Sequence, residues 1–109
     1  MTGLERWDHA RDGEPTESAL RRRLEERGFR VVRYVYPPGT VFLTHAHDAD
    51  RADAVVTGKL RLSANGQEID LEAGDLLCVA RGTPHRAEVV GDEPVVSLDA
   101  ERPRSAGGK

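Results

Sequence analysis

The spacing of apolar positions divides the chain near residue 29. Before that point, Ala19, Leu20 and Leu24 recur at the three- and four-residue intervals of one helical face. Thr16 is suited to cap the start of such a helix, and Gly28 is suited to end it. The pattern predicts one short helix over residues 16–28.

Beyond residue 29 the apolar positions form short alternating runs. Leu60 and Leu62 alternate with polar residues, and "QEIDL" does the same after Asn65-Gly66, a strong hairpin signal. Further runs, such as "LLCVA" and "VVSLDA", are separated by turns that contain glycine. Many short strands after one helix predict an all-β fold over residues 29–100, an antiparallel sandwich or barrel.

Both ends of the chain are polar. Residues 1–15 contain only Leu4 and Trp7 as large apolar groups, and this composition predicts a flexible arm. The alternative is that Trp7 fixes the arm to a neighbouring surface, in the same chain or in a partner subunit. Residues 101–109 have no large apolar side chain and are predicted to be a disordered tail.

Composition narrows the class of protein. The chain of 109 residues is long enough for a single domain, and its net charge of −3 argues against a nucleic-acid partner. The single cysteine excludes an internal disulfide. No apolar run approaches the length of a membrane span or the core of a signal peptide, so we expect no membrane association and a cytoplasmic location.

Three histidines suggest a metal site. His45 and His47 are separated by one residue, and on an extended strand both side chains would point to the same face. His85 follows a turn at the end of an apolar strand, from which the ladder can return it to the first pair. Neutral imidazole is a common ligand of zinc, iron and nickel, so we expect a divalent transition metal (zinc, iron, manganese or nickel). His9 lies in the polar arm and is given no role.

These residues resemble two motifs of the cupin superfamily. Residues 39–58 are similar to G-x5-H-x-H-x3,4-E-x6-G, and residues 74–89 are similar to G-x5-P-x-G-x2-H-x3-N. The matching positions are Gly39, His45, His47, Gly58, Gly74, Gly82 and His85. The resemblance implies a single-domain cupin, that is, a double-stranded β-helix or jelly-roll barrel, with one short N-terminal helix. It also implies that His45, His47 and His85 are metal ligands.

The sequence departs from the motifs at the fourth ligand, where cupins carry glutamate and this chain has Arg51. A guanidinium group has no lone pair to offer a metal. Three interpretations remain open. In the first, the three histidines hold the metal alone, and Arg51 favours anionic ligands. In the second, Asp53, two residues further along the same strand, ligates the metal, supports a histidine or pairs with Arg51. In the third, the metal site has decayed to a binding cavity.

Two functions of different class fit this sequence. The first is a metal-dependent enzyme, dioxygenase- or isomerase-like, acting on a small anionic organic molecule, with Arg51 and Asp53 as candidate catalytic residues. The second is a non-catalytic module that binds or senses a small ligand with a degenerate metal site. We also expect a homodimer, because a small barrel has strand edges to cover. Its predicted contact is residues 29–36 together with the N-terminal arm.

Overall fold

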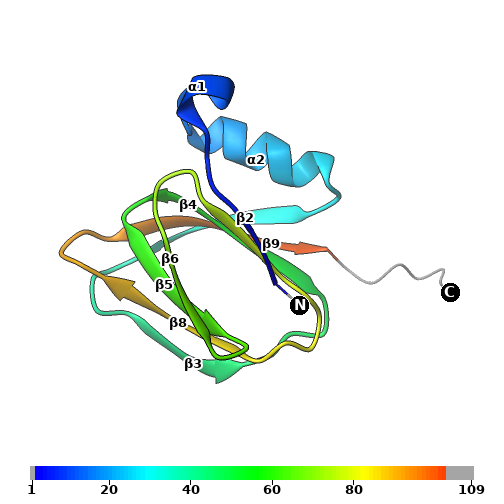
Figure 1. Ribbon diagram of the computed structural model, residues 1–109, viewed down its shortest axis with the longest axis vertical. Coiled ribbons are helices and arrows are strands. Elements are labelled where there is room, and N and C mark those ends of the chain that lie inside the picture. Colours follow the sequence, from blue (N-terminus) through cyan, green and yellow to red (C-terminus); the bar gives the residue numbers. More distant parts are fainter. Residues whose placement is uncertain (1, 103–109) are drawn as a thin grey trace, which may run out of the picture.

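The computed structural model describes residues 2–102, which form two facing antiparallel sheets with a helix packed on the outside (Figure 1). The helices are α1 (His9–Asp12) and α2 (Glu17–Glu26). The strands are β1 (Thr2–Glu5), β2 (Arg30–Tyr36), β3 (Val41–His45), β4 (Asp50–Thr57), β5 (Lys59–Ala64), β6 (Gln67–Leu71), β7 (Leu76–Val79), β8 (His85–Val90) and β9 (Val95–Arg102).

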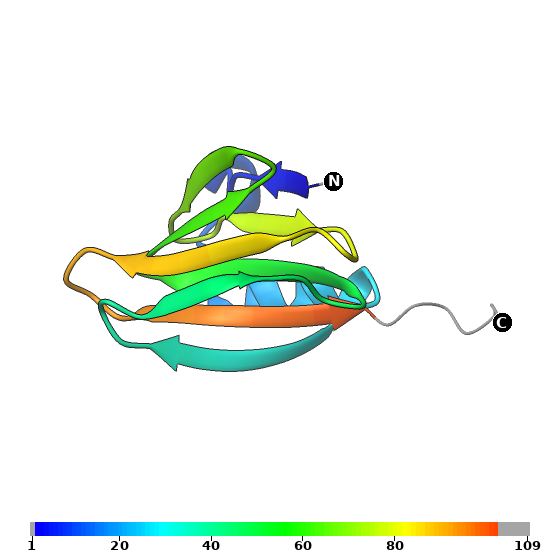
Figure 2. The ribbon, with the colours of Figure 1, turned by 90° about the horizontal axis from the view of Figure 1, so that it is seen from below.

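The five-stranded sheet has the order β1-β7-β4-β9-β2, and the four-stranded sheet has the order β3-β8-β5-β6. The two sheets face each other across the interior, as the edge-on view in Figure 2 shows. This arrangement is an all-β jelly-roll barrel, as the sequence predicts. The β5–β6 hairpin closes through Asn65-Gly66, and both residues have positive φ (54° and 75°), as a two-residue hairpin turn with the twist of the strands requires.

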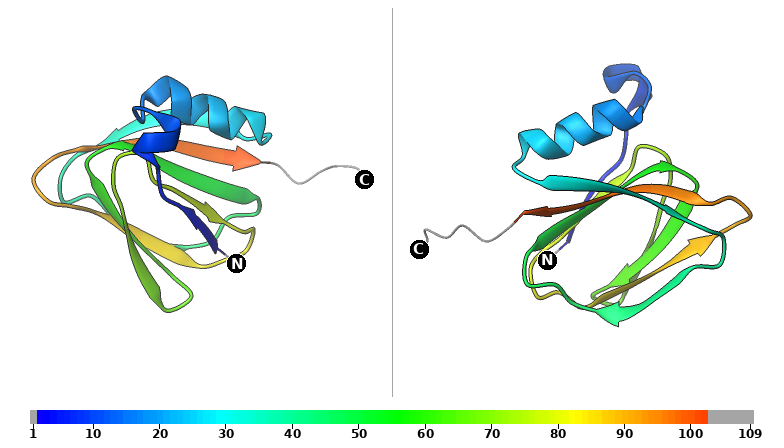
Figure 3. Two further views of the ribbon diagram at one scale, coloured as in Figure 1. Left: turned by 45° about the horizontal axis from the view of Figure 1, so that its top comes forward. Right: turned by 180° about the vertical axis from the view of Figure 1, so that it is seen from behind.

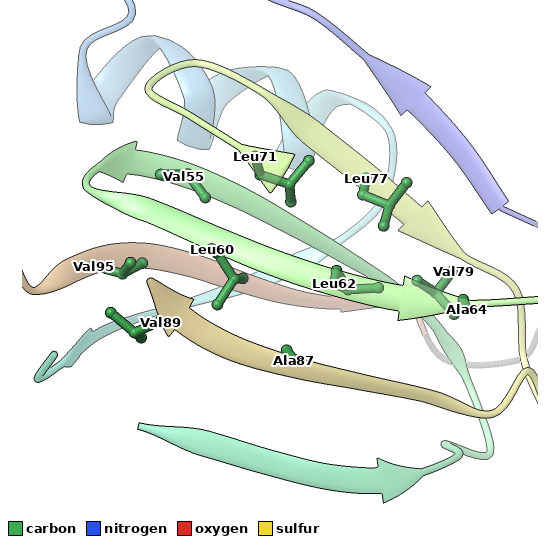
Figure 4. Packing of buried hydrophobic residues seen from close by; sticks show 10 residues of the cluster. All are labelled: Val55, Leu60, Leu62, Ala64, Leu71, Leu77, Val79, Ala87, Val89 and Val95. Atoms are coloured by element: carbon green, nitrogen blue, oxygen red, sulfur yellow. The ribbon is translucent and has the colours of Figure 1, made fainter. Parts of the chain in front are cut away.

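Apolar side chains fill one part of the space between the sheets. Figure 4 shows this cluster: Val55, Leu60, Leu62, Ala64, Leu71, Leu77, Val79, Ala87, Val89 and Val95. Its members come from strands of both sheets and alternate with residues that point outward. Burial of these side chains is the main force that holds the sheets together.

A second apolar cluster lies on the outer face of the five-stranded sheet. Leu20 and Leu24 of α2 are fully buried against Ala52 and Ala54 of β4 and Leu98 of β9. Figure 3 shows α2 lying across this face. Thr16 Oγ1 accepts a hydrogen bond from the Ala19 amide at the start of α2, at 3.1 Å. No helix of residues 2–102 is long and apolar enough to cross a membrane, and the cytoplasmic location stays a prediction.

The N-terminal segment differs from the flexible arm that its polar composition predicts. β1 pairs antiparallel with β7, and Trp7 Nε1 donates a hydrogen bond to the Gly13 carbonyl at 2.8 Å. The Trp7 side chain lies so close to Gly74 that an added Cβ there would be 2.5 Å from it. Trp7 therefore fixes the segment to its own chain. Backbone pairing with β7 needs no apolar side chains, which explains why composition missed it. Of the predicted tail, Glu101 and Arg102 belong to β9 and the rest lies outside the described residues.

Candidate metal centre

Three histidines meet at the open end of the barrel. His45 is the last residue of β3, His85 is the first residue of β8, and the two are direct partners in the ladder. His47 lies two residues beyond the end of β3, in the loop that leads to β4. The ring centroids are 4.6 Å apart for His45–His47, 4.5 Å for His45–His85 and 5.2 Å for His47–His85. One nitrogen from each ring lies within 4.8 Å of the other two, so the group could hold a metal ion.

Backbone carbonyls orient two of these imidazoles. His45 Nδ1 lies 2.7 Å from the Leu43 carbonyl, and His85 Nδ1 lies 2.9 Å from the Thr83 carbonyl. A carbonyl oxygen only accepts hydrogen bonds, so Nδ1 carries the proton in both rings. The lone pair of each neutral ring is therefore on Nε2. A histidine that binds a metal through one nitrogen commonly has its other N–H held in this way.

His47 has a different neighbour. Its Nδ1 lies 3.2 Å from Nη1 of Arg51, a group that only donates hydrogen bonds. Burial and then the positive charge of Arg51 lower the pKa of His47 to about 4. Burial also lowers the pKa of His85. Both rings are therefore neutral at pH 7, the state in which an imidazole can ligate a metal.

The donor set fits a divalent transition metal. Three imidazoles with a fourth, non-protein position form an open site of the kind that catalytic zinc centres use. Within residues 2–102, the group that could hold an ion contains the three histidines and no carboxylate. Arg51 is close to this group, but its contact with His47 makes it a competitor for the ring nitrogen rather than a ligand.

The histidines open onto a cavity of about 190 Å³ between the two sheets. That volume is below the range typical of drug-sized ligands and suits a molecule of a few heavy atoms. The four-stranded sheet contributes the apolar wall beside the histidines, and the five-stranded sheet contributes charged groups. The lining residues are Tyr36, Phe42, His45, His47, Arg51, Asp53, Leu60, Leu62, His85, Ala87 and Asp99.

A pair of carboxyl groups lies deeper in this cavity. Asp53 of β4 and Asp99 of β9 are opposite each other in the ladder, where two negative charges would repel. Burial, together with the charge of Asp99, raises the pKa of Asp53 to about 7. Tyr36 donates a hydrogen bond to Asp99 Oδ2, and Ser97 Oγ donates to Asp99 Oδ1 at 2.6 Å. The arrangement favours a proton on Asp53, beside an Asp99 side chain whose two oxygens each accept a hydrogen bond from a hydroxyl group.

Part of this cavity is predictable from the sequence. Arg51 and Asp53 are two residues apart on one strand and are expected to share a face, and both line the cavity. Asp99 was not predicted as a cavity residue, and Ser97 was given no role. The sequence held no signal for Asp99: in "VVSLDA", Ser97 and Asp99 alternate with apolar Val96, Leu98 and Ala100, a pattern that predicts a solvent-facing Asp99. Asp99 points inward because α2 covers the opposite face of the sheet, where Leu98 and Ala100 lie.

The fold and the site together define a double-stranded β-helix barrel with a histidine cluster at its mouth. The Cupin domain family model matches residues 32–101, so the chain belongs to the cupin family. This match covers all the cavity residues.

Individual relatives are more distant. Nitrosourea synthase from Streptomyces achromogenes is 32% identical over 69 residues, which is 62% of this chain and 15% of that protein. An uncharacterised double-stranded β-helix protein from Klebsiella pneumoniae is 28% identical, with a TM-score of 0.60 over 73% of this chain and 71% of the other. Bacillus subtilis oxalate decarboxylase, studied for its Mn(II) centres, is 24% identical, with a TM-score of 0.60 over 70% of this chain and 22% of the other.

Proposed function

We propose that this chain binds a divalent transition metal (zinc, iron, manganese or nickel) through His45, His47 and His85 and acts on a small anionic organic molecule in the adjoining cavity. The observation that carries the proposal is the convergence of three imidazoles within 4.8 Å at the cavity mouth. Bound there, the metal would supply a Lewis acid or an oxygen-binding centre, suited to dioxygenase- or isomerase-like chemistry.

An anionic ligand is supported by Arg51. Its Nε is buried and has no hydrogen-bond partner among residues 2–102. A buried donor without a partner is costly, and a carboxylate can accept from Nε and Nη together. The charge of a divalent ion held by three neutral ligands adds to this preference for an anion.

Asp53 and Asp99 are suited to proton transfer. A carboxyl group with its pKa near 7 can give or take a proton at neutral pH, which is the property of a general acid or base. We assign Asp53 this task and Asp99, with its Tyr36 and Ser97 hydrogen bonds, the task of holding it in place. The enzyme names of the nitrosourea synthase and oxalate decarboxylase relatives are consistent with catalysis, but both proteins are much longer than this chain.

Metal content tests the proposal. Protein purified without a histidine tag or chelator, then analysed by inductively coupled plasma mass spectrometry, is expected to hold near one equivalent of a single transition metal. His45→Ala should lose that metal, whereas His9→Ala, in exposed α1, should retain it. Absence of metal from the unmodified protein, even after reconstitution with zinc, iron, manganese and nickel, would overturn the proposal.

One observation favours the non-catalytic alternative, a module that binds a small ligand without metal. Arg51 already engages the Nδ1 lone pair of His47, so the site has an internal cation in the position of the family's acidic ligand. An anion bound to Arg51 in the metal-free protein, with no metal uptake, is the outcome that would select this alternative.

We propose that the chain forms a homodimer through the exposed apolar side chains of β2 and β3. These are Val32, Tyr34, Val35, Val41 and Leu43, of which Leu43 is 81% exposed. The N-terminal segment that sequence analysis added to this contact pairs at the opposite edge of the five-stranded sheet, so we leave it out. Light scattering after size exclusion should give twice the chain mass for the wild type and a shift toward the chain mass for Leu43→Asp. A wild-type monomer would remove the proposal.

A further inference from the structure

Arg51 lies where the histidine cluster and the interior charges meet. Its Nη1 is 3.2 Å from His47 Nδ1 and 3.6 Å from Glu101 Oε1. The 3.6 Å separation is an ion-pair distance that is too long for a good hydrogen bond. The side chain is 22% exposed and lines the cavity. Arg51 therefore has a close partner in His47 and a weaker one in Glu101.

The contact with His47 determines which nitrogen of that ring is available. A neutral imidazole has one lone pair and one N–H. Because Arg51 can only donate, the lone pair of His47 is on Nδ1 and is already engaged, and Nε2 carries the proton. His45 and His85 keep their Nε2 lone pairs free of the backbone carbonyls that hold Nδ1. While Arg51 stays on His47, only two of the three rings can ligate.

The present contact with His47 leaves one hydrogen-bond donor of Arg51 unsatisfied among the described residues. This donor is Nε, which is buried. A planar carboxylate accepts two parallel hydrogen bonds from Nε and one Nη, which a single imidazole nitrogen cannot do. Nε–H and Nη2–H form one edge of the guanidinium, whereas Nη1 contacts His47 from the other side, so release of the ring requires the guanidinium to shift toward an anion bound at the Nε edge.

We propose that Arg51 couples the two ligands of the cavity: a carboxylate that engages its Nε–H and Nη–H releases His47 Nδ1 for a divalent metal, so anion and metal bind cooperatively. This inference rests on the proposed function, because it requires the three histidines to bind a metal. By linkage, the metal tightens anion binding by the same factor as the anion tightens metal binding.

The test compares the dissociation constant of Co²⁺ with and without acetate, in wild type and Arg51→Leu, by isothermal titration calorimetry. Sodium chloride at the same ionic strength serves as the salt control, and acetate complexation of free Co²⁺ is subtracted. Acetate should tighten Co²⁺ binding to wild type by about fivefold to tenfold, which is within the range usual for coupled sites. Arg51→Leu should bind Co²⁺ more tightly than wild type without acetate, and its acetate effect should be smaller.

Direct ligation of acetate to the bound metal would also tighten binding, but equally in both proteins. An equal acetate effect in wild type and Arg51→Leu therefore overturns the coupling and leaves the metal site standing. Arg86→Leu removes an exposed arginine next to His85 in sequence and should behave as wild type. If neither wild type nor Arg51→Leu binds Co²⁺, the proposed metal function fails and the coupling fails with it.

A second measurement uses the metal-free wild-type protein, so it does not depend on whether Arg51→Leu folds. In ¹⁵N nuclear magnetic resonance spectra of the wild-type protein, acetate should shift the Arg51 Nε–H signal and change the ring ¹⁵N shifts of His47. The ring shifts of His45 and His85 should change less, because backbone carbonyls hold their Nδ1 atoms. An unchanged His47 ring with a shifted Arg51 Nε–H would overturn the proposal, because the two contacts would then be independent.

Discussion

The two sheets contribute different chemistry to the same cavity. The four-stranded sheet supplies His45 and His85, whose Nδ1 atoms are held by backbone carbonyls. The five-stranded sheet supplies Arg51, Asp53 and Asp99, of which the two aspartates lie opposite each other in the β4–β9 ladder. Backbone carbonyls therefore fix the side chains of the first sheet, whereas interactions between charged and polar side chains govern those of the second.

This difference assigns metal ligation to one sheet and anion binding or proton transfer to the other. Lone-pair donors for a metal must be neutral and fixed, which carbonyl contacts achieve without adding charge. Groups that bind an anion or move a proton must carry charge, which is costly inside a protein unless it is partnered. Arg51 connects the two groups, because its Nη1 lies near both His47 of the histidine cluster and Glu101 of β9.

The largest effect on metal binding is expected from removing one histidine of the four-stranded sheet. His85→Ala should weaken Co²⁺ binding by at least about 100-fold, because loss of a ligand costs more than the 10- to 100-fold that loss of a ligand's supporting group costs. Calorimetry measures this, with His9→Ala as the matched control. Binding within a few fold of wild type would mean that His85 is not a ligand.

A smaller effect on metal binding is expected from introducing a carboxylate ligand on the five-stranded sheet. Arg51→Glu places a carboxylate at the fourth position of the cupin motif and removes the competitor for His47. The Co²⁺ dissociation constant of this variant should be lower than that of wild type by about 10-fold or more, because carboxylate oxygen is a good ligand of divalent ions. An unchanged dissociation constant would mean that residue 51 does not reach the bound ion.

The raised pKa of Asp53 predicts a pH-dependent difference in stability between wild type and a variant that lacks this carboxyl group. The folded protein keeps Asp53 protonated up to its raised pKa of about 7, whereas the unfolded chain releases that proton near pH 4. The contribution of Asp53 to the free energy of unfolding therefore falls as pH rises from about 4 to about 7. Asp53→Asn should match wild type near pH 4 and be more stable at pH 8, by about 1–3 kcal/mol in the free energy of unfolding.

Urea denaturation at the two pH values measures this difference. Asp92→Asn, an exposed change in the turn between β8 and β9, should show no such pH dependence. If Asp53→Asn changed stability equally at both pH values, Asp53 would not hold the extra proton.

The smallest effect concerns the pH dependence of metal binding. An imidazole of ordinary pKa becomes about three-quarters protonated at pH 6, so it weakens metal binding about fourfold relative to pH 8. The lowered pKa of His47, about 4, removes that competition for one ring, and the lowered pKa of His85 reduces it for a second. Co²⁺ affinity should therefore fall between pH 8 and pH 6 by much less than the roughly 60-fold that three ordinary imidazoles would give. A loss of tens of fold would mean that these rings titrate in the ordinary range.

The fold was largely predictable from sequence because its determinants are local. Alternation in "KLRLS" and "QEIDL", the Asn65-Gly66 turn and the two motifs each depend on a few neighbouring residues. The convergence of His45, His47 and His85 is a long-range contact between β3 and β8, and it was predictable because these residues match the two cupin motifs. The expected strand geometry for His45 and His47 was less accurate, since β3 ends at His45.

Other long-range partners were not predictable. The Asp53–Asp99 pair requires the β4–β9 register, and the strand pairing of residues 2–5 requires the free edge of β7. Neither register is encoded in a local pattern. The contact between Arg51 and His47 depends on side-chain rotamers in a loop and a strand, which no spacing rule specifies.

The placement of Trp7 has a practical consequence for optical measurements. It is the chain's single tryptophan, with its indole N–H bonded to Gly13 and the guanidinium of Arg23 4.5 Å from its ring. Intrinsic fluorescence excited at the red edge of protein absorption therefore reports whether the N-terminal segment is docked. It should stay silent while a ligand fills the cavity, whose aromatic residues are Tyr36 and Phe42. A change in emission during a titration would signal undocking of β1 rather than occupancy.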